Sequence, residues 1–219
     1  MDNNKTHCSK CTNGPDCKLD TSSYATRPND LTCPYFKRRD EKMKVTILRE
    51  AGYEEAMLGL SLSFNADPSR MPARAAKLAK MDPASGEVKF LEAIAVWLDV
   101  TAPRYWWSQF DTYRAGVSKQ SESTMHTLMR TVLEAHHFEG GIDETILGAL
   151  NNAISTNDFG YAKRHLPESF LQRRIVTTNY KTILHIIRQR HDHKLTEWQD
   201  FCLAMRGLKY RHYIFGGDR

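Results

Sequence analysis

The pattern of hydrophobic and polar positions changes near residue 41 and divides the chain into two parts. Residues 1–40 are rich in Asn, Thr, Ser, Asp and Pro and show almost no apolar periodicity. From residue 43 the sequence alternates as a strand over 43–48, and apolar residues then recur at helical spacing over 54–64. The pattern therefore predicts a folded domain at residues 41–219. It also predicts that residues 1–40 need something other than a hydrophobic core to hold a structure.

The rest of the domain is predicted to be mostly helical. Pro103 is well placed to begin a helix that carries Trp106, Phe110 and Tyr113 on one face. The other expected elements are a loop at 65–72, a short helix at 73–80, a buried strand within 87–100, a loop at 118–124, and helices at 125–135, 144–156, 179–193 and 196–205.

Composition and charge narrow the class of protein. The 219 residues are 41% hydrophobic and 26% charged, which is typical of a globular protein with one core. The longest apolar run, 90–100, is interrupted by Glu92 and Asp99 and is too short to cross a membrane. The first residues do not resemble a secretory signal, so we expect a cytoplasmic protein. The net charge of +5 suits a nucleotide phosphate as well as nucleic acid, and the scattered basic residues do not favour nucleic acid.

Four of the five cysteines lie close together in the polar N-terminal part, at Cys8, Cys11, Cys17 and Cys33. Four thiols in a segment without a core predict a metal-stabilised module, and the Cys-x2-Cys pair is a usual way to present two thiolates to Zn²⁺. An iron–sulfur cluster is the competing cofactor, because Cys33 is followed by proline as in some cluster-binding sequences. Free or redox-active thiols are the third interpretation.

A second group of chemically interesting residues lies between residues 162 and 190. Basic side chains at Lys163 and Arg164 precede Leu166-Pro167, and a predicted helix from 179 then carries polar groups among aliphatic ones. The simplest interpretation is an amphipathic helix with a solvated face. The alternative is a helix that presents several polar groups to a ligand.

The run from 163 to 198 resembles the carboxy-terminal signature of the flavin-dependent thymidylate synthases, the ThyX family, in which an Arg-x-x-Leu-Pro segment precedes an Asn-x-Arg helix and a later Arg. The segment 59–65 is similar to the family's early Ser-Tyr segment, and 107–114 occupies the place of its central helix. The resemblance covers most of residues 43–205. It implies an α+β fold, a helix-rich domain with a small antiparallel sheet.

The resemblance also implies which residues contact ligands. Residues expected at the flavin are Tyr113, Asn179, Lys181, His185 and Arg190. Residues expected at the pyrimidine nucleotide are Gln109, Arg114, Ser121, Ser123, Lys163, Arg164 and, again, Arg190. Tyr105, Trp106, Trp107 and Tyr113 are candidates for stacking on a flavin or a base, with core packing as the alternative role. The chain departs from the family's Arg-His-Arg motif, because Thr112, Tyr113 and Arg114 stand in its place.

The implied function is that of a pyrimidine deoxynucleotide C5 methyltransferase or hydroxymethyltransferase that uses FAD, a dUMP-type substrate and methylenetetrahydrofolate. The family also implies a homo-oligomer, with a tetramer favoured. Outside the cysteine-rich part only Cys202 remains, on an expected core face, and a flavin mechanism needs no such nucleophile. The alternative is a catalytically inactive ThyX-like scaffold that binds a nucleotide or nucleic acid. A redox protein with an iron–sulfur centre beside a flavin is a third hypothesis.

We predict that residues 1–40 bind one metal ion per chain, because four thiolates are the only evident source of order there. Elemental analysis of protein purified without chelator is expected to find about one equivalent of zinc, or about two to four equivalents of iron if a cluster is bound. Deleting residues 1–40 is expected to leave a domain that unfolds cooperatively on heating. Protein free of both metals would contradict the first expectation, and a truncated chain without a thermal transition would contradict the second.

Overall fold

The computed structural model describes residues 43–216. The strands are β1 (Lys44–Ala51), β2 (Ala95–Pro103), β3 (Ser118–Ser121) and β4 (Leu171–Asn179). The α-helices are α1 (Tyr53–Leu62), α2 (Met71–Leu78), α3 (Arg104–Phe110), α4 (Thr124–Thr127), α5 (Glu144–Ser155), α6 (Phe159–His165), α7 (Tyr180–Arg190), α8 (Thr196–Met205) and α9 (His212–Phe215). Short 3₁₀ helices lie at Pro68–Arg70, Gly86–Glu92, Leu128–Arg130 and Ala135–His137. The predicted ligands Cys8, Cys11, Cys17 and Cys33 lie outside the described residues.

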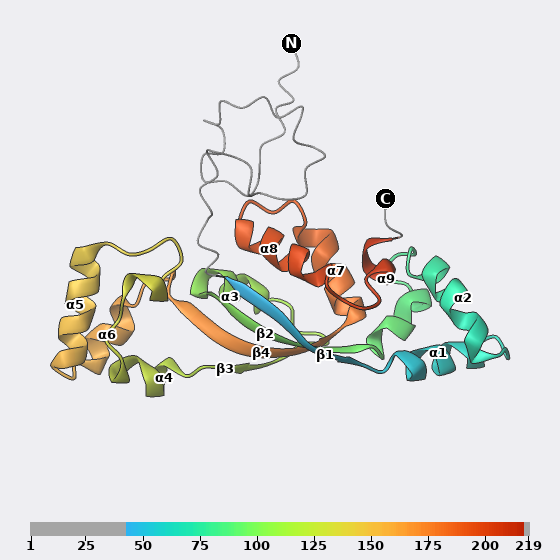
Figure 1. Cartoon of the computed structure of the whole chain (residues 1–219), viewed down its shortest axis with the longest axis horizontal. Helices are drawn as coiled ribbons and strands as arrows, with labels where there is room; N and C mark the ends of the chain where they lie inside the picture. The colour runs from blue at the N-terminus through green and yellow to red at the C-terminus, as the bar shows by residue number, and fades with distance from the viewer. Residues whose placement is uncertain (1–42, 217–219) are drawn as a thin grey trace, which may run out of the picture. The chain divides into compact units, whose positions relative to one another are not determined.

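The four strands form one antiparallel sheet in the order β1-β2-β4-β3 (Figure 1). The two long central strands pair over their full length, from Ala95 opposite Asn179 to Pro103 opposite Leu171. The edge strand β3 pairs only with β4, and Ser118 lies opposite Thr177. The sheet confirms the expected α+β class.

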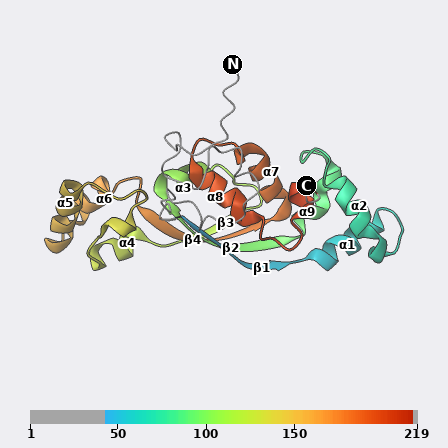
Figure 2. The ribbon, with the colours of Figure 1, turned by 45° about the horizontal axis from the view of Figure 1, so that its top comes forward.

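Helices cover one face of the sheet. In β2 the side chains of Val96, Leu98 and Val100 are fully buried, whereas the intervening residues are half-buried, as expected for a sheet with one covered face. Figures 1 and 2 show α3, α7 and α8 on the same side of the strands. Aromatic rings fill the space between these helices and the sheet, including the fully buried Trp106 and Trp198, whose centroids are 4.7 Å apart. Burial of such large rings is a major source of stability.

Two smaller groups of helices extend beyond the ends of the sheet (Figure 1). At one end α1 and α2 continue the main hydrophobic core through Met57, Met71 and Ala75. At the other end, the segment between β3 and β4 builds its own apolar cluster around Phe138 and Leu150, to which α5 and α6 contribute. The sheet therefore joins a main core and a separate smaller core.

Several expected elements are confirmed. The strand expected at 43–48 is β1, and the helices expected at 54–64, after Pro103, at 144–156 and at 196–205 are α1, α3, α5 and α8. The long helix expected from 179 is α7, with Asn179 as its N-terminal cap. These segments share strong apolar periodicity or a clear start residue, and in such cases local pattern and tertiary packing agree.

Other expected elements are wrong. The segment 118–124, expected to be a loop, contains β3, whose four polar residues suit a short, exposed edge strand without any apolar alternation. The helix expected at 125–135 stops early, as α4 and a 3₁₀ turn. The strand expected within 87–100 begins only at Ala95, because a 3₁₀ helix precedes it. The helix α2 begins inside the loop expected at 65–72. Tyr113, expected on the helix after Pro103, lies beyond the end of α3. No element was expected at α6 or β4.

Among residues 43–216 the structure has no helix that is both long enough and apolar enough to span a bilayer.

We predict that Gly52→Ala destabilises the domain severely, by about 2 kcal/mol or more. Gly52 lies between β1 and α1 with φ of 90°, and a Cβ atom there would stand 2.1 Å from the carbonyl oxygen of Ala93. Gly59 is the matched control: it lies within α1, and a Cβ atom would meet nothing within 4 Å. Gly59→Ala is expected to stabilise by about 0.5 to 1 kcal/mol, because alanine favours helix. Chemical denaturation measures both, and equal stabilities would contradict the argument.

Candidate functional site

A cavity of about 890 Å³ lies where the loop after α3 meets the start of α7. The loop contributes residues 112–116, and the β4–α7 junction contributes Asn179, Lys181, Thr182 and His185. Pro83, Ala84 and Glu92 complete the wall. This volume is in the range of pockets that hold nucleotides and other ligands of that size.

The junction between β4 and α7 places the polar groups of one wall. Asn179 is the last residue of the strand, and its Oδ1 accepts a hydrogen bond of 2.9 Å from the backbone N–H of Thr182. This N-terminal cap lets the chain change from strand to helix without an intervening loop. Lys181, Thr182 and His185 therefore occupy the first turns of α7, beside the cavity.

The loop of the opposite wall packs closely on this junction. Thr182 Oγ1 donates a hydrogen bond of 3.3 Å to the carbonyl oxygen of Ala115. At Gly116, where φ is 70°, a Cβ atom would stand 2.5 Å from Thr182 Oγ1 and 2.7 Å from Asn179 Nδ2. Only glycine combines this backbone conformation with such a close approach. Gly116 and Thr182, which the sequence analysis did not select, hold the two walls together.

Two positive side chains line the cavity in different electrostatic situations. Lys181 Nζ lies 2.6 Å from Glu92 Oε1, so its charge is balanced within the wall. Arg114 is exposed, and its side chain makes no hydrogen bond or ion pair with any residue from 43 to 216. Arg114 is therefore the cavity cation that is available to an anionic ligand such as a phosphate.

Tyr113 is the aromatic residue that reaches the cavity. Its ring is 8% exposed and stands edge-on to His185, with centroids 6.1 Å apart. Trp106 and Trp107 are fully buried among core rings, which contradicts a stacking role for them. Tyr105 donates its hydroxyl hydrogen bond to the buried carboxylate of Glu197, and it does not line the cavity.

The residues selected from the sequence separate into three groups in space. The first group, Tyr113, Arg114, Asn179, Lys181 and His185, lines the cavity. The second group, Gln109 and Arg190, lies behind Tyr113, where Arg190 Nε donates a 2.8 Å hydrogen bond to the Tyr113 hydroxyl. The third group, Ser121, Ser123, Lys163 and Arg164, lies on β3, α6 and the start of α4, outside the cavity lining. Their contacts with ligands stay predictions.

The third group contains a small basic cluster. Lys163 Nζ donates a hydrogen bond to Thr124 Oγ1, directly after Ser123. Partial burial and the positive charge of Arg104 lower the pKa of Lys163 from its ordinary value. Arg104 is itself paired with Glu168 Oε1 at 3.1 Å, whereas no ion pair of Lys163 or of the exposed Arg164 occurs within residues 43–216.

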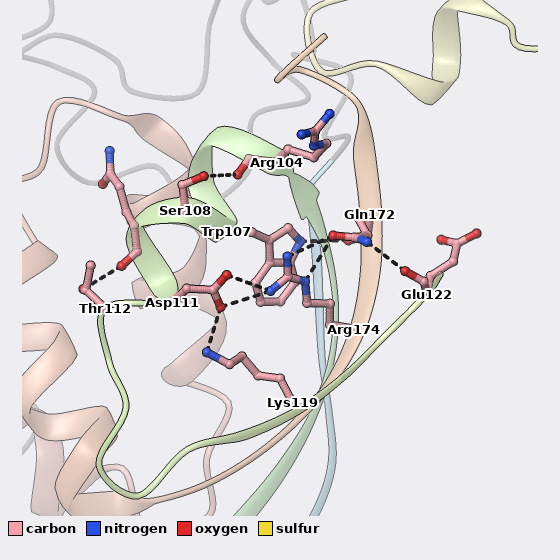
Figure 3. Close-up of polar contacts among 10 residues, drawn as sticks. Arg104, Trp107, Ser108, Asp111, Thr112, Lys119, Glu122, Gln172 and Arg174 are labelled. Carbon is pink, nitrogen blue, oxygen red and sulfur yellow. Dashed lines mark hydrogen bonds and ion pairs between the residues drawn. The ribbon is translucent and has the colours of Figure 1, made fainter. Parts of the chain in front are cut away.

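A polar network fixes the loop that carries Arg114 (Figure 3). Asp111 follows α3 directly and accepts hydrogen bonds from Lys119 Nζ at 2.7 Å and Arg174 Nη1 at 3.0 Å. The Arg174 guanidinium carbon also lies 4.3 Å from the centroid of the Trp107 ring. Asp111 had no role in the sequence analysis, because its partners lie on β3 and β4 and no local pattern joins them.

The charges around Asp111 set its ionisation. Burial, the largest influence, raises its pKa, but the hydrogen bonds and positive charges of Lys119 and Arg174 together bring the pKa below its ordinary value. The carboxylate form therefore ties α3 to β3 and β4 at neutral pH. The loop between these elements is held at both of its ends.

Cys202 does not belong to the site. It is buried in α8, and burial raises the pKa of its thiol to about 11. It is the one cysteine of the described residues, so this part of the chain offers no activated thiolate. No group of three or more His, Cys, Asp or Glu side chains among residues 43–216 is arranged to hold a metal ion.

Comparisons with solved structures agree with this architecture. Two crystal structures of thymidylate synthase X (ThyX) from Helicobacter pylori, both with FAD and dUMP, match with TM-scores of 0.66 and 0.65. Each match has 17% sequence identity and covers 80% of this chain and 98% of the ThyX chain. The domain has a ThyX-like fold. No protein-family model and no curated protein matches the sequence.

We predict that Asp111→Asn destabilises the domain by about 1 kcal/mol at pH 7, because two partly exposed ion pairs lose their acceptor charge. The lowered pKa means that this stability is present above the unfolded-state pKa, about 3.9, and is lost as the pH falls through the folded-state value. The difference in free energy of unfolding between wild type and variant should be constant above about pH 5 and should narrow as the pH falls below about pH 4.

The control is Glu55→Gln, because Glu55 is exposed and its side chain makes no hydrogen bond or ion pair with any residue from 43 to 216. Denaturation curves between pH 3 and pH 8 measure all three proteins. A gap between wild type and Asp111→Asn that stayed unchanged at low pH would contradict the role of the charge.

Proposed function

We propose that this chain binds a flavin, FAD, together with a pyrimidine deoxynucleotide of the dUMP type, and transfers a methyl or hydroxymethyl group from methylenetetrahydrofolate to C5 of the base. The observation that carries the proposal is the cavity. Five residues that the sequence analysis expected to contact the flavin or the nucleotide come from two distant segments and line one cavity. The ThyX-like fold supports the same assignment.

The residues of the cavity fit a flavin nucleotide. Arg114 offers a guanidinium that no described side chain neutralises, as a phosphate requires. Asn179 and Thr182 satisfy each other and the loop backbone, so they shape the wall, whereas the exposed imidazole of His185 is open to a ligand. A reduced flavin supplies hydride when it is bound, and such chemistry needs no protein nucleophile. The raised pKa of the Cys202 thiol agrees with that requirement.

The chain's own residues would bind and orient the ligands. Arg114 would neutralise phosphate, and the Tyr113 ring would bound the flat surface of a ring system. The basic cluster at Lys163, outside the cavity, would take a second phosphate. The proposal includes a homo-oligomer, a tetramer, as the resemblance implies.

A second candidate function is a ThyX-like scaffold that binds a nucleotide without catalysis. It is favoured by one observation: Thr112 and Tyr113 replace two basic residues of the family's motif, and both line the cavity. Fewer positive charges remain there to stabilise charge that develops during a reaction. Release of tritium from C5 of labelled dUMP distinguishes the two functions. Binding without release would favour the scaffold.

We predict that the purified protein binds FAD and therefore absorbs near 450 nm.

We also predict that Arg114→Ala weakens FAD or dUMP binding about tenfold or more, because the substitution removes a charge-assisted hydrogen bond. Arg130→Ala is the matched control, because Arg130 is exposed and does not line the cavity. Isothermal titration measures the affinities, and light scattering on the same samples should give a multiple of 25.2 kDa. Wild-type protein that binds neither ligand would contradict the proposed function.

A further inference from the structure

Four side chains from three helices and one loop form a connected group behind the cavity, which we call the Arg190 network: Gln109, Tyr113, Arg190 and Trp198. Trp198 Nε1 donates a 2.8 Å hydrogen bond to Gln109 Oε1, and Arg190 Nη1 approaches the same oxygen at 3.4 Å. Arg190 Nε donates to the Tyr113 hydroxyl at 2.8 Å. Trp198 is fully buried, so one end of the network is fixed in the core.

Arg190 is half-buried and is held by this network. Its guanidinium carbon lies 4.8 Å from the centroid of the Trp198 ring and 5.7 Å from that of Tyr113. Cation–π contacts of this kind stabilise a charge that no carboxylate pairs with, and no ion pair of Arg190 occurs within residues 43–216. Arg190 does not line the cavity. Its two hydrogen bonds and two ring contacts all point to neighbours that hold it in place.

The hydrogen of the Tyr113 hydroxyl is also used inside the protein. The hydroxyl accepts from Arg190 Nε and donates to Gln189 Oε1 at 2.9 Å. A phosphate oxygen or any other acceptor on a ligand would have to displace Gln189 from this hydroxyl. What Tyr113 presents to the cavity is therefore its ring, set edge-on to His185.

We propose that Arg190 and Gln109 are positioning residues that fix the Tyr113 ring on the cavity wall, and that neither touches the phosphate of a nucleotide or flavin. The expected effect of these two residues on ligand binding rests on the proposed function. It differs from the expectation that the sequence raised for both residues, which was direct contact with ligand. Arg190 acts on the ligand only through Tyr113.

The two roles have different physical signatures. A guanidinium that pairs with a phosphate releases counterions, so its loss reduces the salt dependence of binding. A guanidinium that orients a tyrosine contributes through the fixed ring, so its loss weakens binding at every salt concentration alike. In the second case, the losses of affinity on removing the guanidinium and on removing the Tyr113 hydroxyl should not add, because both changes break the same hydrogen bond.

The test is a double-mutant cycle on the full-length protein with FAD and dUMP as the probes. Arg190→Ala and Tyr113→Phe are each expected to weaken binding about three- to tenfold, and the double variant no more than the stronger single variant. The salt dependence of affinity should match wild type in Arg190→Ala and be smaller in Arg114→Ala. Additive losses, a reduced salt dependence in Arg190→Ala, or single variants that bind as well as wild type would overturn the inference.

A ligand-free measurement separates this inference from the proposed function. In a ¹⁵N correlation spectrum at neutral pH, the Arg190 Nε–H signal should be protected from exchange in wild type and lost in Tyr113→Phe, whereas Arg188 Nε–H should behave alike in both. Arg188 is exposed, and its side chain makes one hydrogen bond within residues 43–216, to the carbonyl oxygen of Met81. If wild-type protein binds no ligand, the proposed function fails, but this signal still shows whether Arg190 is hydrogen-bonded to Tyr113. An unprotected Arg190 signal in wild type would refute it.

Discussion

The change from β4 to α7 at Asn179 is the constraint on which the candidate site depends. The same residue ends a central strand of the sheet and caps the helix that follows, so no flexible loop intervenes. Because β4 pairs with β2 along its full length, the first turns of α7 are placed by the sheet itself. Polar groups on rigid elements keep a more constant geometry than those on loops.

The opposite wall of the cavity is a loop, and three contacts make it rigid. Asp111 fixes its beginning through Lys119 and Arg174, and Gly116 packs its end against the cap of α7. Tyr113, between them, is held by Arg190. Arg114 is thus an exposed charge on a segment that is fixed on both sides of it. A site with a fixed frame and one free cation is suited to recognise an anionic group without a large entropic cost.

Thr112 and Tyr113 stand where the motif that the sequence resembles has two basic residues, and both line the cavity. Thr112 and Tyr113 lower the positive charge of the cavity, and the Lys181–Glu92 pair adds none. The Tyr113 ring instead forms an aromatic part of the cavity wall, and this ring packs against the buried Trp198. The proposed binding would therefore depend on the shape of the cavity and on Arg114 more than on several positive charges, and Lys163 lies outside this cavity.

The sequence by itself determined the elements whose pattern is local. The helices α1, α5 and α8 follow from apolar periodicity, and Asn179 identifies the start of α7 by the chemistry of helix capping. It also selected five residues of the cavity. Only the tertiary structure decided that β3 is a strand, since an exposed edge strand has no apolar alternation and is defined by its partner β4. Likewise, Asp111, Glu92 and Gly116 owe their roles to residues far away in the chain. Arg190 shows the same limit: the resemblance implied that it contacts the flavin and the nucleotide, whereas its partners on α3 and α8 turn it toward Tyr113.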